Sequence, residues 1–143
     1  MLFVGSHERQ LDDKGRLALP AVFRTQLGEH CYLAKGSDKC IEVIPAPQFE
    51  ADAAALMEAT RRGETSRHAR RSLANSAAAV VFDKQGRVKV DDALLEFAGI
   101  PLDSTVRITG NLDRIEIWEP ARQRELEALG DDELASPDRP DGE

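Results

Sequence analysis

The chain is organised around the stretch Asp12-Asp13-Lys14-Gly15-Arg16-Leu17-Ala18-Leu19-Pro20. A related stretch, Asp83-Lys84-Gln85-Gly86-Arg87-Val88-Lys89-Val90, follows at an offset of 71 residues. In each copy an aspartate stands four residues before an arginine, a glycine directly precedes that arginine, and alternating apolar residues follow. Glycine supplies the positive φ of a tight turn, and the alternation is typical of a half-buried strand. Each copy therefore predicts a turn that leads into a short strand.

The repeat extends beyond the two turns. Gly28 matches Gly99 at the same offset, and residues 41–44 match residues 115–118 at an offset of 74. Each unit predicts the same order of elements: a strand, the turn, a return strand, a short helix that ends at the matched glycine, and a hairpin. Units this small cannot each bury a full core, so we expect them to pack on one another as a pseudo-symmetric pair.

Helices are expected at several points along the chain. The short helices of the two units are predicted over residues 20–27 and 91–98, the second with an N-cap from its leading aspartates. Apolar residues at helical spacing predict a connector helix near residues 49–60, and another helix is expected over residues 66–77. We expect the apolar face of this connector to pack within the chain, and its arginines to lie on a solvated helix face or in subunit ion pairs.

The two ends of the chain differ in character. Residues 1–5 are interpreted as the first strand, and a last helix is predicted from Pro120 to Leu129, where Gly130 stops it. Residues 131–143 are acidic, contain two prolines and show no apolar period, which predicts disorder. The chain is thus divided into a first half-unit, a helical connector, a second half-unit with a C-terminal helix, and a disordered acidic tail, at residues 1–48, 49–78, 79–130 and 131–143.

Composition bounds the class of protein. The 143 residues are 41% hydrophobic and carry a net charge of −7. No apolar run is long enough to span a membrane, and the N-terminus does not resemble a secretory signal, so a cytoplasmic protein is expected. The two cysteines, Cys31 and Cys40, are expected to be free thiols, without a metal site. Residues 121–143 alone contribute −5 of the net charge. Because binding follows the local potential, the acidic total weakens the interpretation of the chain as a nucleic-acid-binding protein but does not exclude it.

Enzyme motifs are absent from the sequence. It contains no phosphate-binding loop, no dinucleotide fingerprint, no zinc-protease helix and no nucleophile elbow. His30 stands beside Cys31, but adjacent strand residues point to opposite faces, so we expect a surface histidine and a core cysteine. No catalytic residues, cofactor, metal or small-molecule substrate are predicted.

The two turns allow two interpretations from the residues alone. Asp12 with Arg16, and Asp83 with Arg87, can form ion pairs across each turn, although exposed pairs of this kind add at most about 1 kcal/mol each. Alternatively, the basic side chains of the turns can contact DNA: arginine binds guanine O6 and N7 in a bidentate manner, and lysine pairs with phosphate. The candidate DNA-binding residues are Lys14, Gly15, Arg16, Lys84 and Arg87, with Asp12, Asp83 and Gly86 as structural residues of the motif.

The doubled motif resembles the MraZ family of bacterial transcriptional regulators. The resemblance covers about residues 1–128 and is carried by residues 11–20 with Phe23 and Arg24, by the second Asp-Lys-Gln-Gly-Arg motif, and by the closing Ile115-Glu116-Ile117-Trp118. It implies an α+β protein of two tandem swapped-hairpin β-barrel half-units, an AbrB-like fold, related by a pseudo-two-fold axis and joined by connecting helices.

The resemblance also implies a function. Family members form ring-shaped homo-oligomers on the nucleoid and bind repeated promoter boxes upstream of the division and cell-wall gene cluster that includes their own gene. By this resemblance Lys14, Gly15 and Arg16 contact bases and Arg87 helps to hold the double-stranded DNA, which indicates a transcription regulator, and a repressor. The alternative is a protein-interaction module on the same barrel, in which the acidic tail contacts the partner.

Overall fold

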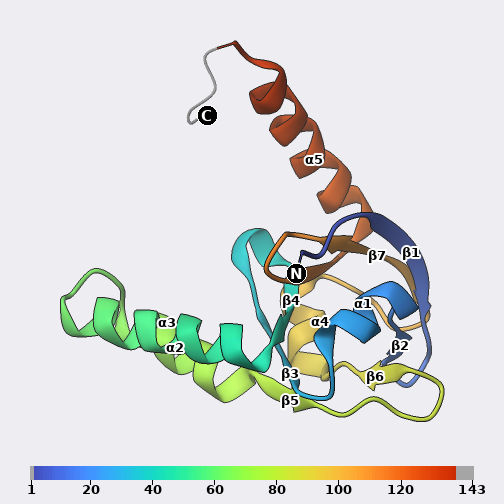
Figure 1. The fold of residues 1–143 in the computed structure, drawn as a ribbon, viewed down its shortest axis with the longest axis horizontal. Helices are drawn as coiled ribbons and strands as arrows, with labels where there is room; N and C mark the ends of the chain where they lie inside the picture. Colours follow the sequence, from blue (N-terminus) through green and yellow to red (C-terminus); the bar gives the residue numbers. More distant parts are fainter. Residues whose placement is uncertain (1, 138–143) are drawn as a thin grey trace.

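The body of the protein is a six-stranded antiparallel sheet to which both halves of the chain contribute (Figure 1). The computed structural model describes residues 2–137. The order of the strands across the sheet is β1-β7-β8-β4-β3-β5, and β2 and β6 form a separate two-stranded ribbon. The strands are β1 (Ser6–Leu11), β2 (Arg16–Ala18), β3 (Cys31–Lys35), β4 (Ile41–Pro45), β5 (Ala78–Val80), β6 (Arg87–Lys89), β7 (Ser104–Gly110) and β8 (Ile115–Trp118).

The two halves exchange their first strands. β1 of the first half pairs with β7 of the second, and β5 of the second half pairs with β3 of the first. The two remaining strand pairings between the halves, β4 with β8 and β2 with β6, join matched elements of the repeat. This arrangement is α+β and pseudo-symmetric, as the repeat predicts. A closed barrel was also expected, and that prediction is wrong: the large sheet has free edges at β1 and β5.

Five α-helices accompany the strands within the described residues. They are α1 (Ala21–Leu27), α2 (Ala46–Arg61), α3 (Arg67–Ser76), α4 (Asp92–Ala98) and α5 (Pro120–Ala135). α1 and α4 cover the core and end at the matched glycines, Gly28 and Gly99, whose φ angles are 72° and 68°. Asp91 occupies the N-cap position of α4, but its side chain makes no capping hydrogen bond.

The core lies between the main sheet, the β2–β6 ribbon and the two short helices. Alternation places Leu17 and Val88 inward from the ribbon, where each is 1% exposed. Phe23 of α1 is fully buried against Phe3 and His7, with ring centroids 6.0 and 5.3 Å away. This core is shared by both halves, as expected for units too small to fold alone.

Both cysteines are buried free thiols, as expected. Burial raises the pKa of Cys31 to about 11, so its thiol is protonated at neutral pH. The adjacent His30, which lies just before β3, is exposed, so the expected surface histidine is confirmed.

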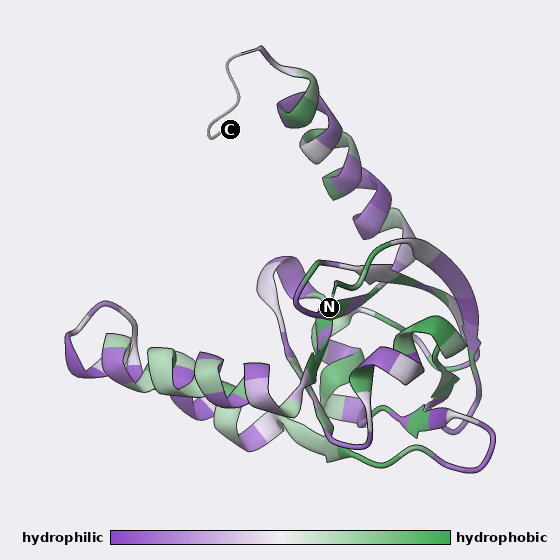
Figure 2. Cartoon of the chain, in the orientation of Figure 1, coloured by the Kyte–Doolittle hydropathy of each residue, from purple (hydrophilic) through white to green (hydrophobic). Residues whose placement is uncertain are grey.

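Two helical arms project from the body (Figure 1). α2 and α3 lie side by side and form one arm, in which Ser66 caps α3 by accepting a hydrogen bond from the Ala69 amide at 3.0 Å. The second arm is α5, which begins after the last strand. Hydropathy colouring shows a mixture of apolar and polar residues along the first arm and mostly polar residues along the second (Figure 2).

The structure corrects two predictions about the chain ends. The first strand begins at Ser6 rather than within residues 1–5, where Phe3 forms only an isolated bridge to Leu112. α5 continues through Gly130 to Ala135, so the predicted stop and the predicted disorder of residues 131–135 are wrong. Glycine costs about 1 kcal/mol in a helix, and the good helix formers on both sides outweigh this single penalty. Residues 138–143 of the predicted tail lie outside the described residues.

Candidate nucleic-acid interface

Each Asp-x-x-Gly-Arg turn is closed by its own aspartate. In the first turn, Asp12 Oδ1 accepts hydrogen bonds from the backbone amides of Lys14 and Arg16 at 2.9 and 2.8 Å, and Asp12 Oδ2 accepts one from Arg16 Nε at 2.7 Å. Gly15 takes a φ of 80°, which any other residue adopts only with strain. The carboxylate thus fixes both the turn and the base of the arginine side chain.

The second turn repeats this geometry. Asp83 accepts from the backbone amides of Gln85 and Arg87, each at 2.9 Å, and from Arg87 Nε at 3.0 Å. Gly86 has a φ of 76°. The ion pairs expected across each turn are therefore present, and Arg87 Nη1 also lies 4.0 Å from Asp12 Oδ2, which links the two turns.

The two turns are brought together by the β2–β6 ribbon. Arg16 pairs with Lys89, Leu17 with Val88, and Ala18 with Arg87. The pseudo-two-fold axis therefore passes through the Leu17–Val88 pair. Backbone hydrogen bonds obey the same symmetry: the amide after each return strand, at Val90 and at Leu19, donates to the glycine carbonyl of the opposite turn at 2.8 and 3.4 Å.

The outward face of the ribbon carries three cations. Because Leu17 and Val88 point into the core, the alternate residues Arg16, Arg87 and Lys89 point away from it, with Ala18 as the fourth member. Lys14 and Lys84, in the two turns, are exposed. The ribbon thus brings Arg16 and Arg87 together, with exposed Lys14 and Lys84 in the flanking turns, although the two copies of the motif lie 71 residues apart. The fifth predicted DNA-binding residue, Gly15, is buried.

The turn aspartates orient the guanidinium groups of Arg16 and Arg87 but leave terminal nitrogens available for other hydrogen bonds. Within the described residues, Arg16 uses only Nε for its side-chain hydrogen bond, and both terminal amino groups are left without a partner. Arg87 likewise donates from Nε, with one terminal nitrogen in the 4.0 Å contact with Asp12. The paired side chains of Arg16 and Arg87 keep 37% and 29% of their surface exposed. Such groups can donate to an external acceptor without first breaking the turn.

Two further basic residues belong to the surface and were not predicted as site residues. Lys89 Nζ would lie 3.2 Å from a Cβ built on Gly15, so this lysine covers the first turn. Arg24 of α1 lies over the second turn, where a Cβ on Gly86 would be 2.7 Å from its guanidinium carbon, and its Nε donates to the Leu19 carbonyl at 3.1 Å. The alternation of residues 87–90 could have identified Lys89, whereas the position of Arg24 depends on tertiary packing.

The connector arginines do not join this surface. In Figure 1 the arm of α2 and α3 extends to the left of the body, whereas β2 and β6 lie at its right. Arg61 and Arg62, at the end of α2, pair with Glu58 and Glu64 instead.

Asp12 and Asp83, the turn aspartates, remain ionised at pH values well below neutral. The backbone amide of Arg16 is the largest of several hydrogen bonds and charges that hold the pKa of Asp12 at about 2, below its ordinary value of 3.8. The corresponding amide of Arg87 also lowers the pKa of Asp83. A lowered folded pKa means that the ionised form stabilises the fold above pH 3.8, and that this contribution is lost as pH falls to about 2.

This assignment predicts the pH dependence of an Asp12→Asn variant. Its urea midpoint should lie below that of the wild type at neutral pH, and the difference should shrink between about pH 4 and pH 2. Urea unfolding measured across this range checks the result. Asp13→Asn is the matched control, because within the described residues no donor contacts that carboxylate, and it should stay close to wild type. A constant Asp12→Asn difference down to pH 2 would contradict the proposed role of the carboxylate.

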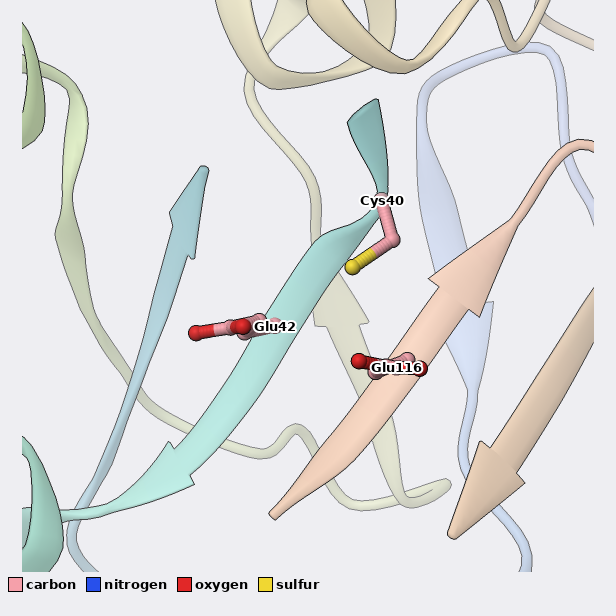
Figure 3. Close-up of side chains that lie close together, drawn as sticks. All are labelled: Cys40, Glu42 and Glu116. Carbon is pink, nitrogen blue, oxygen red and sulfur yellow. The ribbon is translucent and has the colours of Figure 1, made fainter. Parts of the chain in front are cut away.

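A cluster of possible metal ligands lies on the main sheet, away from the turns. Figure 3 shows Cys40 and Glu42 at β4 and Glu116 on β8, with one ligand atom from each within 4.8 Å of the others. Protein donors already contact the carboxylates: Glu42 accepts from Arg114 at 3.0 Å, and Glu116 from the Trp118 indole at 3.2 Å. Burial, with help from the two carboxylates, raises the pKa of Cys40, and a protonated thiol is a poor metal ligand. The cluster is a polar network that joins two central strands.

Sequence comparisons show the family of the chain. A family model described as "MraZ protein, putative antitoxin-like" matches residues 2–72. The transcriptional regulator MraZ of Corynebacterium jeikeium is 39% identical over 140 residues, which cover 93% of this chain and 96% of that protein. This chain belongs to the MraZ family. MraZ of a Nocardioides species is 42% identical over 130 residues, covering 90% and 88% of the two chains, and MraZ of Salinispora tropica is 37% identical over 134 residues, covering 94% and 93%.

Membership of the MraZ family confirms the resemblance carried by the two turns. The family model spans the first turn, α2 and the first part of α3, and the relatives extend the match across the second turn as well. These MraZ relatives are named as transcriptional regulators, which is not an enzyme class. Within residues 2–137, no helix is both long enough and apolar enough to cross a membrane.

Proposed function

We propose that this protein is a sequence-specific DNA-binding regulator that reads double-stranded DNA with the outward face of its β2–β6 ribbon. The observation that carries the proposal is the pairing of the two Gly-Arg turns, which puts Arg16, Arg87 and Lys89 on one face. The major groove of B-DNA is about 12 Å wide and admits a two-stranded β-ribbon. The names of the relatives support regulation of transcription as the outcome of this binding.

The residues divide into two roles. Arg16 and Arg87 are held at Nε by their aspartates. The terminal amino groups of Arg16 suit the bidentate contact with guanine O6 and N7, and the guanidinium of Arg87 can hold the DNA backbone at a phosphate. Lys14 and Lys84 lie in exposed turns, where they can pair with backbone phosphates and fix the register. Gly15 and Gly86 are buried at positive φ, where a Cβ would meet Val90 and Lys89 or the Arg24 guanidinium, so glycine lets the two turns pack closely enough to bring Arg16 and Arg87 together.

One ribbon offers few cations, so we propose that several copies act together. A ring-shaped homo-oligomer that presents one ribbon to each of several repeated promoter boxes gains affinity through effective concentration, often by about 10²–10⁴-fold. By the family resemblance, the boxes lie upstream of the division and cell-wall cluster that includes the protein's own gene. The bound ring represses that promoter in the cytoplasm, on the nucleoid.

The exchange of first strands supports the finer description of the fold. In this proposal residues 1–48 and 79–130 are the two AbrB-like swapped-hairpin half-units, and residues 49–78 connect them. The pairings of β1 with β7 and of β5 with β3 are the exchanges that such an architecture requires. α5 then extends the second half-unit into the region that the sequence assigned to the tail.

A mobility-shift experiment tests the proposal directly. Wild-type protein is mixed with the DNA upstream of its own gene, and with a shuffled fragment of equal length, at two salt concentrations. A shift of the promoter fragment that persists at the higher salt, where the shuffled fragment is released, supports specific reading. No shift of either fragment at the lower salt would overturn the DNA-binding function.

Arg87→Ala should weaken promoter binding less than loss of Arg16 does. The expected signature is a shallower dependence of log affinity on log salt, by about 0.9 for each phosphate contact that is lost. Affinities measured at four or more salt concentrations give the slope. An unchanged slope and affinity would show that Arg87 serves only to close its turn on Asp83.

The acidic C-terminal region favours one alternative, a protein-interaction module. Residues 125–135 of α5 carry five acidic residues and no basic one. In this alternative they contact a basic partner protein. Deletion of residues 131–143 that abolishes capture of such a partner but preserves the DNA shift would support it.

A further inference from the structure

The helical arm of α2 and α3 carries an apolar groove that nothing in the chain covers. Neither helix contains a buried residue, although α2 alone spans 16 residues. A groove of about 340 Å³ runs between them and is lined mainly by apolar side chains. They include Phe49, Leu56, Met57 and Leu73, and Met57 is 49% exposed. A helix pair that buries so little of its apolar stripe is typical of a surface completed by another molecule.

The rim of this groove is basic. α3 contains Arg67, Arg70 and Arg71 and no acidic residue, and Arg70 lines the groove itself. Within the described residues, no carboxylate lies within ion-pair distance of these three arginines. The occupant of the groove should therefore combine apolar side chains with negative charge.

The distal half of α5 has this combination. Leu129 is 61% exposed, whereas Leu126, one turn earlier, is half-buried and lines a pocket on the body of its own chain together with Trp118. Acidic residues flank them, namely Glu125, Glu127, Asp131, Asp132 and Glu133. Of these five, only Glu127 takes part in a side-chain hydrogen bond within the described residues, from Gln123 at 3.0 Å.

We propose that α5 of one subunit docks into the groove between α2 and α3 of a second copy of this chain. Leu129 would enter the groove beside Leu56, Met57 and Leu73. The acidic flanks of α5 would pair with the three arginines of α3. Residues 125–135 extend over about 16 Å, which fits along the roughly 24 Å of α2.

The shape of the subunit directs this contact to a neighbour. The two arms leave the body in different directions, and the far end of α5 lies well away from α2 and α3 (Figure 1). The donor and the acceptor surfaces differ, so the contact is head-to-tail and propagates until it closes into a ring. The inference rests on the self-association proposed above, and it names the surfaces that produce it.

Charge reversal tests the interface. One variant carries Arg67→Glu, Arg70→Glu and Arg71→Glu, and the other carries Glu125→Lys, Asp131→Lys and Asp132→Lys. Each should run as a monomer by light scattering under conditions in which the wild type is an oligomer. An equimolar mixture should reassemble, because each reversed α3 then meets a reversed α5, and each normal α3 meets a normal α5, so that every contact again joins opposite charges. Lys39→Glu, an exposed reversal away from both arms, should remain oligomeric, and circular dichroism verifies that every variant is folded.

The possible results distinguish failure of the proposed interface from failure of the proposed self-association. A wild type that is monomeric at all concentrations would overturn the proposed ring and this interface together. An oligomeric wild type whose two variants also remain oligomeric would overturn only the assignment of α5 and the α2–α3 groove. Two monomeric, folded variants that fail to assemble when mixed would contradict pairing between these helices.

Discussion

Arg16→Ala should abolish specific promoter binding while the fold and the oligomer persist. Each bidentate contact between arginine and guanine contributes about 1–3 kcal/mol of discrimination, or roughly 5- to 150-fold, and an oligomer loses this factor at every box it occupies. The terminal amino groups of Arg16 have no other partner within the described residues, so besides the contact with DNA the substitution removes only the hydrogen bond from Arg16 Nε to Asp12. Asp12 keeps its two backbone amide donors at 2.9 and 2.8 Å, which hold the turn. Mobility shift and light scattering of the same preparation measure both properties.

The matched control for this experiment is Arg61→Ala. Arg61 is an exposed arginine on the helical arm and pairs with Glu58, away from the ribbon. Its loss changes the net charge by the same amount and should leave promoter affinity within about twofold. Undiminished binding by Arg16→Ala would remove the ribbon from the proposed mechanism. An equal loss in both variants would show that total charge, rather than the Gly-Arg turn, controls affinity.

Phe23→Ala should have the largest effect on stability among single substitutions in the first half-unit. Phe23 is fully buried, and its ring makes edge contacts with Phe3 and His7. Truncation of such a phenylalanine costs about 3–5 kcal/mol, a large share of the roughly 5–15 kcal/mol that holds a domain folded. Urea unfolding followed by the fluorescence of Trp118, the single tryptophan, measures the change in unfolding free energy.

The preceding residue supplies the control for the core. Val22 occupies the same helix but is 54% exposed, so Val22→Ala should change the unfolding free energy by no more than about 0.5 kcal/mol. A similar small effect for Phe23→Ala would mean that α1 is not anchored in the shared core. Because Arg24 follows directly on α1 and covers Gly86, loss of this anchor should also disturb the second turn.

The repeat made much of the fold predictable. Gly28 and Gly99 end their helices where the sequence places the ends, since a positive φ favours glycine and few other residues. The inward positions of Leu17 and Val88 followed from alternation. The exchange of strands between halves did not follow from local pattern, because pairing partners separated by some hundred residues leave no periodic signal in the sequence.

The C-terminal helix and the surface of the ribbon show where prediction from local sequence patterns fails. Gly130 was interpreted as a helix stop, but the residues around it continue α5 to Ala135. The glycines that do end helices here, Gly28 and Gly99, take a positive φ, and Gly130 does not. The ribbon brings the predicted residues Arg16 and Arg87 together, whereas Arg24 was missed because only tertiary packing brings α1 of one half onto the turn of the other.

The exchange of strands has a consequence for synthesis on the ribosome. The first Gly-Arg motif is translated early, but β1 cannot find its partner until β7, whose residues begin at Ser104, has left the exit tunnel. At about 5–20 residues per second the nascent chain waits for several seconds with its reading surface unformed. A prematurely terminated product that ends before β6 lacks half of the ribbon and should be inert at the promoter. If the ribbon binds DNA as proposed, a product that ends before β6 cannot compete for the operator and is no dominant inhibitor of the full-length protein.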